Sequence, residues 1–344
     1  MANGNTSPSR LGQVNASGNV NELFLKVFSG EILTTFEEQN VMKDLHMVRT
    51  IQSGKSAQFP VTGIATAGYH TAGESIADSG NGYLSAIKHA ERVISIDDVL
   101  ISSTFIANID ELKNHYDVRS IYAKELGKAL AKRFDIATMK TLAAAARGTS
   151  DIGGEDGTIL GASTSMFATA TATTQELIDA LYAIAENLDG KDVSDEGRFA
   201  LLSPADYYTL ITADNNAISA VSNRDAGGVG NIAEGTIARV AGINLVKSNH
   251  LSTIAVDNSG VATGDGSASV NNDVFGGGSA GEGYNGDLSA TRILAGTKEA
   301  IGTVKLLDLA TESEYQIERQ GTLFVAKYAM GHGVLRPECA VEVR

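Results

Sequence analysis

Two segments of this 344-residue sequence carry side chains that could bind phosphate or a metal ion. Residues 53–56 (SGKS) resemble the end of a phosphate-binding loop, but Arg49 stands where that loop requires glycine. Residues 189–196 (DGKDVSDE) are acidic enough for a calcium loop, but Ser194 stands where that loop requires glycine. We therefore interpret both segments as polar turns rather than as binding sites.

Other groups that could do chemistry are dispersed. No two of the six histidines are spaced as i, i+3 or i, i+4, and no HExxH motif occurs, which argues against a histidine-based metal site; the histidines are residues 46, 70, 89, 115, 250 and 332. Cys339 is the single cysteine, which excludes a disulfide framework and a cysteine-ligated zinc site and favours a structural thiol. The sequence has no G-x-S-x-G nucleophile elbow. We predict no catalytic, cofactor-binding or metal site, and a protein that is not an enzyme.

The composition of the chain argues against further classes of protein. No run of about 18 apolar residues occurs, so no helical membrane protein is predicted. The first twenty residues are polar and lack the apolar stretch of a secretory signal. With 27 basic and 41 acidic side chains, the net charge is −14, which argues against a general nucleic-acid binder.

The excess negative charge is confined to the middle of the chain. Residues 1–148 contain 15 basic and 15 acidic side chains, whereas residues 149–300 contain 7 and 20, and residues 301–344 contain 5 and 6. The central block is also rich in glycine. This shift predicts an inserted domain between two segments that belong to another structural unit.

Elements of the first half suggest contacts between chains. Residues 1–20 read as an extended arm, and residues 22–36 as an amphipathic helix that packs on its own domain or on a neighbouring subunit. Residues 56–61 and 91–97 read as strands, separated by the glycine-containing segment 67–85. An isolated long hairpin is marginally stable in water, so it usually lies against something, often another chain.

A helix over residues 117–146 is the clearest helical element. Its apolar residues recur at i+4 steps, Gly148 stands at the position of a terminating glycine, and Arg147 suits the negative end of the helix dipole. About 30 residues at 1.5 Å each span roughly 45 Å, which suggests a structural spine.

The central block and the C-terminal region predict shorter elements. Thr173 and Glu176 form a capping-box pattern before a helix, and Ser203-Pro204 opens another helix after a strand at 199–202. We also expect strands at 237–240 and 243–246 around Gly242, a loop at 257–290 with almost no core residues, strands at 303–306, 322–330 and 341–343, and a turn at 331–333.

Several strings resemble the T-seven-type major capsid proteins of short-tailed DNA bacteriophages. They occur in the family's order across residues 22–140 and 300–338: 23–31 (LFLKVFSGE), 46–49 (HMVR), 53–61 (SGKSAQFPV), 88–97 (KHAERVISID), 114–120 (NHYDVRS), 302–309 (GTVKLLDL) and 326–338 (AKYAMGHGVLRPE). The acidic block matches poorly in sequence, although its order of elements is similar.

The resemblance implies the α+β tailed-phage capsid fold named after phage Hong Kong 97. On that fold, residues 1–47 would be the N-terminal arm, 48–101 the extended loop and 102–148 the peripheral domain with its spine helix. Residues 149–300 would be the axial domain, and 301–344 would return to the peripheral β strands.

The implied function is self-assembly as hexamers and pentamers into an icosahedral shell around double-stranded DNA. The family also implies a portal protein at one vertex, assembly in the bacterial cytoplasm, a T=7 lattice, and no membrane. Because only about twenty polar residues precede the predicted arm helix, we expect a separate scaffolding protein. Candidate assembly contacts are Phe24, Val27, Phe28, Lys55, Phe59, Lys88, Glu91, Arg92 and Arg119. The charged residues of the hairpin among these could equally form a solvated strand face.

Three other functions remain open from the sequence. An encapsulin-like compartment shell would share the fold but package proteins. An enzyme could use the glycine-rich block as a ligand loop, and a phage tail adhesin could use the Gly/Ser/Thr-rich loops for binding.

Overall fold

The computed structural model describes residues 40–63, 65–77, 83–84, 87–109, 118–150, 154–161, 166–167, 172–212, 230–231, 236–237, 239–251, 284, 288 and 290–344. The predicted arm helix at 22–36 lies outside these ranges, and so do Phe24, Val27 and Phe28. The described chain forms two compact units. One contains Val99–Phe134 and Leu307–Met330, and the other contains Val41–Asp98, Asp135–Leu306 and Gly331–Arg344.

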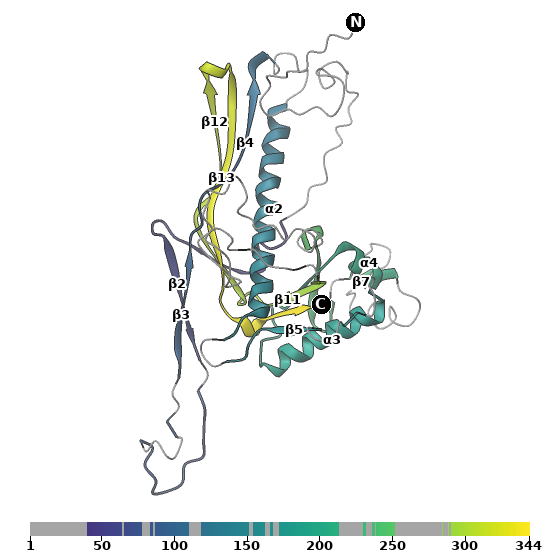
Figure 1. Ribbon diagram of the computed structural model, residues 1–344. Helices are drawn as coiled ribbons and strands as arrows, with labels where there is room; N and C mark the ends of the chain where they lie inside the picture. Colours follow the sequence, from purple (N-terminus) through teal and green to yellow (C-terminus); the bar gives the residue numbers. More distant parts are fainter. Residues whose placement is uncertain are drawn as a thin grey trace. The chain divides into compact units, whose positions relative to one another are not determined.

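Three long elements run from one unit into the other: helix α2 (Val118–Arg147) and strands β12 (Ile301–Gln316) and β13 (Gly321–Val334) (Figure 1). The two strands belong to a four-stranded sheet of order β1-β12-β13-β4, in which β1 is Met47–Thr50 and β4 is Leu100–Ala107. β1 pairs with β12 in parallel and β4 pairs with β13 antiparallel. The strand predicted at 303–306 is therefore the beginning of a 16-residue strand.

Within the first unit, β4 and β13 approach closely at Gly321. A Cβ atom there would lie 2.4 Å from the carbonyl oxygen of Ile106, so only glycine fits. The turn between β12 and β13 contains a 3₁₀ helix (Ile317–Arg319) followed by Gln320, whose φ is +50°. Asn108 donates a hydrogen bond of 3.0 Å to the hydroxyl of Tyr315 beside this turn.

The second unit is built on a six-stranded sheet of order β5-β14-β11-β6-β10-β9. Its strands are β5 (Thr158–Leu160), β14 (Ala340–Val343), β11 (Ile293–Gly296), β6 (Phe199–Leu202), β10 (Ile243–Lys247) and β9 (Arg239–Val240). Strand β14, the last of the chain, pairs with β11 and β5. β14 therefore lies in this sheet, whereas β12 and β13 lie in the four-stranded sheet. A separate short pair, β7 (Gly230–Asn231) and β8 (Thr236–Ile237), is antiparallel.

Two helices contribute to the core of this unit: α3 (Thr174–Gly190) and α4 (Pro204–Thr212). The capping box predicted for α3 is confirmed, because Thr173 accepts from the Glu176 amide and the Glu176 carboxylate accepts from the Thr173 amide. The apolar face predicted for α3 is fully buried in one hydrophobic cluster with β6, β10, β11 and β14. Ser203 likewise accepts from the Asp206 amide at the beginning of α4.

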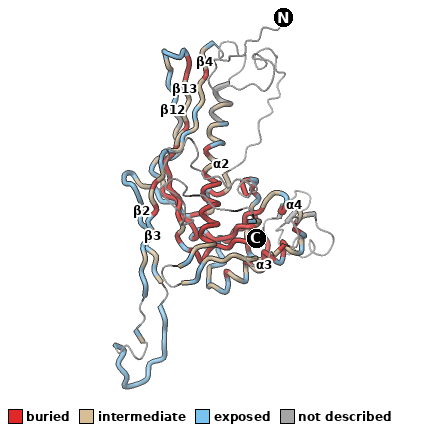
Figure 2. Tube along the Cα trace, in the orientation of Figure 1, coloured by how far each residue is buried: buried red, intermediate tan, exposed pale blue. Residues whose placement is uncertain are grey.

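Helix α2 has the predicted bounds to within one residue, but its burial is not that of a one-sided helix. From Phe134 to Ala146 every residue is buried, as the red part of α2 in Figure 2 shows. Gly148 follows the helix without a left-handed φ. Arg147 does not simply cap the helix dipole, because its guanidinium donates two hydrogen bonds of 2.7 Å to the buried carboxylate of Glu342.

One loop prediction was wrong. The segment 331–333, predicted as a turn, continues β13, and all three of its residues are buried. In the 257–290 segment, where almost no core residues were expected, the described residues Tyr284 and Leu288 are 2% and 1% exposed. Each of these two side chains supplies the large apolar surface that the surrounding Gly/Ser/Asn composition lacks.

Candidate assembly hairpin

The predicted hairpin is present as strands β2 (Ser56–Thr62) and β3 (His89–Ser95). The two pair antiparallel in a sheet of their own, with Ser56 opposite Ser95 and Thr62 opposite His89. Backbone hydrogen bonds extend the pair at both ends, from the Ile96 amide to Lys55 and from the Gly63 amide to Lys88. Gly54, with φ of +118°, makes the turn that precedes β2, which agrees with a polar turn rather than a phosphate loop at 53–56.

The two faces of the hairpin have different environments. Side chains alternate along both strands: Ala57, Phe59, Val61, Ala90, Arg92 and Ile94 belong to a partly or fully buried face. The residues that alternate with them, such as Gln58, Glu91 and Val93, are exposed, Val93 at 53%. This alternation is typical of a strand pair that rests on its own protein with one face only.

Ile94 anchors the hairpin. Its side chain is 1% exposed and lies above two glycines in strands β12 and β13. A Cβ atom on Gly333 would lie 2.7 Å from Ile94 Cγ1, and one on Gly302 would lie 3.2 Å from Ile94 Cδ1. The two glycines therefore create the space that Ile94 fills. An isolated glycine within a strand pattern is the sequence signal for such a close approach.

Arg49 of β1 makes a second connection to the hairpin. Its guanidinium donates a 2.7 Å hydrogen bond to the carbonyl oxygen of Gln58 and lies 5.6 Å from the centre of the Phe59 ring. The cation–π contact and the hydrogen bond together fix β2 beside β1. Phe59 is thus engaged within its own chain.

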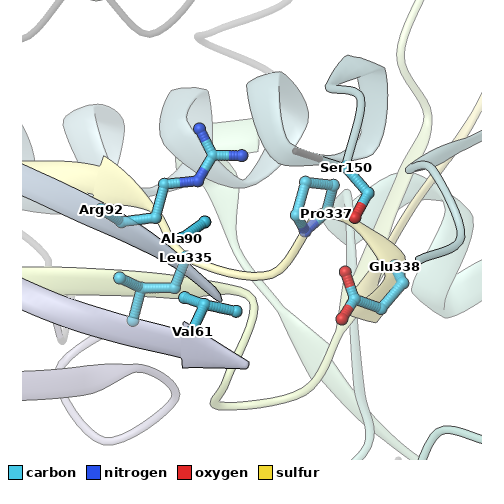
Figure 3. A pocket seen from close by; sticks show the side chains of 7 residues that line it. All are labelled: Val61, Ala90, Arg92, Ser150, Leu335, Pro337 and Glu338. Atoms are coloured by element: carbon cyan, nitrogen blue, oxygen red, sulfur yellow. The ribbon is translucent and has the colours of Figure 1, made fainter. Parts of the chain in front are cut away.

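A small pocket lies where the hairpin meets the rest of the second unit (Figure 3). Its lining comes from both hairpin strands, the segment that follows α2 and the segment before β14: Val61, Ala90, Arg92, Ser150, Leu335, Pro337 and Glu338. In Figure 3, Arg92 and Glu338 flank the ring of Pro337. The volume open to water is about 10 Å³, which suits roughly one water molecule and no larger ligand.

A buried series of hydrogen bonds holds Asp97, which follows the hairpin. The hydroxyl of Tyr284 donates a 2.7 Å hydrogen bond to Asp97 and accepts one of 3.0 Å from the His332 amide. The His332 ring in turn lies 2.8 Å from the Thr303 hydroxyl. Burial lowers the pKa of His332 to about 3, and the nearby His46 acts in the same direction, so His332 is neutral at pH 7.

The far end of the hairpin lacks such support. All described residues from 65 to 77 are exposed, as the pale blue stretch beyond β2 and β3 in Figure 2 shows. Leu84 and Ile87 are exposed as well. Large apolar side chains are among them: Tyr69 is 103% exposed, Ile76 58% and Leu84 63%. Exposed apolar groups concentrated on one element are typical of an interaction surface.

The structure separates the residues proposed from sequence into three groups. Lys55, Lys88 and Glu91 are exposed on the hairpin. Arg92 and Phe59 are partly buried against their own chain, Arg92 in the small pocket and Phe59 beneath Arg49. The side chain of Arg119, like Phe24, Val27 and Phe28, lies outside the described residues.

The side chain of Arg198 organises the acidic turn that follows α3. Arg198 is 3% exposed and forms ion pairs of 2.7 Å with Asp189 and 2.9 Å with Asp195. It also donates to the carbonyl oxygens of Val193 and Ser194. Among the described residues, no group of three or more His, Cys, Asp or Glu side chains could hold a metal ion. Within the same residues, no helix is long and apolar enough to cross a membrane.

Comparison with known proteins identifies relatives over nearly the whole chain. Residues 58–344 match the model of the Gp10A-like major capsid protein family. The chain is 36% identical over 337 residues to the major capsid protein of Escherichia phage T7, covering 94% of this chain and 92% of that protein. It is 35% identical to the major capsid protein of Enterobacteria phage T3, covering 92% and 90%.

Solved structures agree with this assignment. The capsid structure of cyanophage P-SCSP1u is similar at 40% identity and a TM-score of 0.73, covering 98% of both chains. The mature capsid subunit of bacteriophage PhiM1, at 18% identity and a TM-score of 0.67, shares the fold. The chain therefore belongs to the Gp10A-like family of major capsid proteins, and it has the α+β tailed-phage capsid fold named after phage Hong Kong 97.

Proposed function

We propose that this capsid protein assembles as hexamers and pentamers into an icosahedral shell around double-stranded DNA, and that its hairpin joins neighbouring subunits. The observation that carries the proposal is the contrast along the hairpin. Ile94 at its base is 1% exposed, whereas Tyr69, Ile76 and Leu84 toward its far end are more than half exposed. Burying such side chains on another copy would remove apolar surface from water in every subunit of the shell.

The proposed division of the chain follows the family. Residues 1–47 form the N-terminal arm, 48–101 the extended loop and 102–148 the peripheral domain with α2. Residues 149–300 form the axial domain, and 301–344 carry the long strands β12 and β13 of the peripheral domain. The exception that we propose is β14, which pairs with β5 and β11 and so completes the axial sheet.

The charged residues of the hairpin would stabilise the shell because their ion pairs are many, although each pair is weak. Lys55, Lys88 and Glu91 are exposed and available to a neighbouring subunit. Exposed ion pairs contribute only about 0–1 kcal/mol each, but a closed assembly repeats every contact many times. Arg92 and Phe59 would instead stabilise the base of the hairpin in its own chain.

The remaining partners follow from membership in a capsid family. We propose a separate scaffolding protein during assembly, a portal protein at one vertex, and assembly in the cytoplasm of the bacterial host before the virion is complete. The protein would act by association and not by catalysis, and it would enclose DNA without reading its sequence. The acidic composition supports a shell that does not hold its DNA tightly, because few basic side chains are in excess to contact phosphates.

Electron microscopy of particles made with the scaffolding protein tests the proposal. We expect closed shells with fivefold and sixfold clusters, and a variant in which an Asn-Gly turn replaces residues 66–86 should yield soluble subunits instead. Subunits that never form shells with the wild-type hairpin would refute the proposal. Shells that consistently contain a cargo protein would favour an encapsulin-like compartment, for which the phage relatives give no support.

A further inference from the structure

The tip of the hairpin contains a hydrogen-bonded group of side chains although it is exposed. The Tyr83 hydroxyl donates a 2.5 Å hydrogen bond to Glu74 Oε2 and accepts one of 3.1 Å from the Thr71 amide. His70 Nε2 donates a 2.9 Å hydrogen bond to the carbonyl oxygen of Glu74. The His70 and Tyr83 rings lie 5.1 Å apart, tilted by 53°. We call these four residues, His70, Thr71, Glu74 and Tyr83, the tip cluster.

The tip cluster holds the backbone that directly follows one residue, Tyr69, which makes none of these contacts. Tyr69 is 103% exposed, while its neighbour His70 is held by the Glu74 carbonyl and the Tyr83 ring. The Thr71 amide, one residue further on, donates to the Tyr83 hydroxyl. Tyr69 is thus exposed beside a stretch of backbone that hydrogen bonds hold within the tip.

We propose that the tip cluster pre-positions Tyr69, which inserts into a second copy of this chain when shells form. The inference rests on the proposed function of the hairpin, and it identifies Tyr69 as the side chain that contributes most to the binding energy of that contact. An aromatic side chain with a polar end is well suited to anchor an interface, and anchors of this kind carry most of the binding energy. Ordering the tip before contact removes the entropy cost of ordering it on contact. Tyr83 is then a positioning residue and Tyr69 the contacting one.

Tyr83→Phe separates these roles because it keeps the ring and removes only the hydroxyl. In unassembled subunits, amide hydrogen exchange over residues 65–77 should accelerate about fivefold or more, the factor that corresponds to a net loss of roughly one hydrogen bond. The subunit concentration needed for shells should rise by a similar factor. Tyr69→Ala should raise that concentration further while leaving exchange in the tip unchanged. Tyr208→Phe is the matched control, since it removes an exposed hydroxyl that accepts from Lys247, and it should leave tip exchange unchanged.

A photo-crosslinking residue identifies the partner. With p-benzoylphenylalanine replacing Tyr69, irradiated shells should contain covalent dimers of this chain. Adducts with the scaffolding protein, or no adducts, would overturn the inference, and so would a Tyr83→Phe variant that loosens the tip but assembles at the wild-type concentration.

The variant with residues 66–86 replaced by Asn-Gly separates the two proposals. If it fails to assemble while Tyr83→Phe assembles normally, only the pre-positioning is refuted; if it assembles, the proposed role of the hairpin fails as well.

Discussion

Ile94 in β3 fills the space that Gly333 in β13 leaves open. The would-be Cβ of Gly333 lies 2.7 Å from Ile94 Cγ1, well inside van der Waals contact. Strand β13 is buried here, and Ile94 is 1% exposed, so neither partner can move into solvent without loss of packing. The contact fixes the base of the hairpin relative to the strand on which it rests.

Gly333→Ala should therefore destabilise the subunit by about 1–3 kcal/mol through overpacking, measured by urea unfolding. Ile94→Ala creates room at the same site, so the double variant should be less destabilised than the sum of the two single variants. Gly127→Ala in α2 is the control, because nothing lies within 4 Å of its Cβ position, and it should stabilise by up to about 1 kcal/mol. Additive effects at Gly333 and Ile94 would contradict the contact.

The buried carboxylate of Glu342 supplies a second prediction. It accepts from Arg147, from the Thr291 hydroxyl at 2.5 Å and from Arg344 at 3.0 Å, and it is fully buried. Burial alone would raise its pKa, but these donors hold the pKa below its ordinary value of 4.5. Glu342→Gln leaves the partly buried Arg147 without its counter-charge and should cost about 3 kcal/mol or more in urea unfolding.

Glu312→Gln is the matched control for this substitution. Glu312 pairs with Lys327 at 2.8 Å on the surface, where its side chain is 65% exposed, so the loss should stay below about 1 kcal/mol. The wild-type advantage over Glu342→Gln should be complete above pH 4.5 and should shrink as pH falls below it, because a lowered carboxyl pKa stabilises only the ionised protein. Equal losses for the two variants would argue against a buried ion pair at Glu342.

His332 predicts a different pH dependence. Its pKa is about 3 in the folded chain against an ordinary 6.5, so between these values the unfolded chain binds a proton that the folded chain does not. Stability should therefore fall as pH decreases from 6.5 toward 3, by at most about 1.4 kcal/mol per pH unit from this group. His46, whose pKa burial also lowers, adds to the same slope. His332→Asn should flatten the profile, measured by thermal unfolding, and the difference between variant and wild type at pH 8 gives the cost of altered packing. Parallel profiles for variant and wild type would contradict this prediction.

Asp135 connects α2 to a segment 94 residues earlier. Its fully buried carboxylate accepts from the amides of Val41 at 2.9 Å and Met42 at 3.2 Å, and His250 Nδ1 lies 3.1 Å away. Asp135→Asn replaces one acceptor with a donor, so we expect a loss of about 1–3 kcal/mol and faster hydrogen exchange at the Val41 and Met42 amides. Thr138→Ala is the control, because the Thr138 hydroxyl donates within α2 to the Asp135 carbonyl and should leave these two amides protected. Unchanged exchange in Asp135→Asn would contradict the assigned hydrogen bonds.

Local patterns made much of the fold predictable. The capping box at Thr173 and the Ser203-Pro204 pair depend on neighbours within a few residues, and both are present as expected. The hairpin strands and α2 were predictable for the same reason, since period and length identify them. The segment 331–333 was not, because glycine usually marks a turn, and the packing of Ile94 that requires glycine there comes from a residue more than 200 positions away.

The assembly hairpin was predictable as an element and less so residue by residue. Arg92 was proposed as an interface residue for its charge and Phe59 for its aromatic ring. Neither property reveals which face of a strand packs against the same chain. Conversely, Tyr83 and Glu74 meet although they are nine positions apart, and no short spacing in the sequence signals that contact. The residues that hold the hairpin in place were hidden because their partners are remote in sequence.

The acidic central block should make assembly depend on salt. Residues 149–300 contain 20 acidic and 7 basic side chains, and a shell would gather five or six copies around each axis. Raising ionic strength from about 0.01 M to about 0.1 M shortens the range of charge repulsion from about 30 Å to about 10 Å, so the yield of shells in sedimentation should increase. Asp192 and Glu196 are exposed, and Asn tolerates the φ of +55° at position 192, so Asp192→Asn with Glu196→Gln removes two charges per subunit without straining the turn. That variant should assemble at lower salt than the wild type. If both respond alike, repulsion within this block does not control assembly.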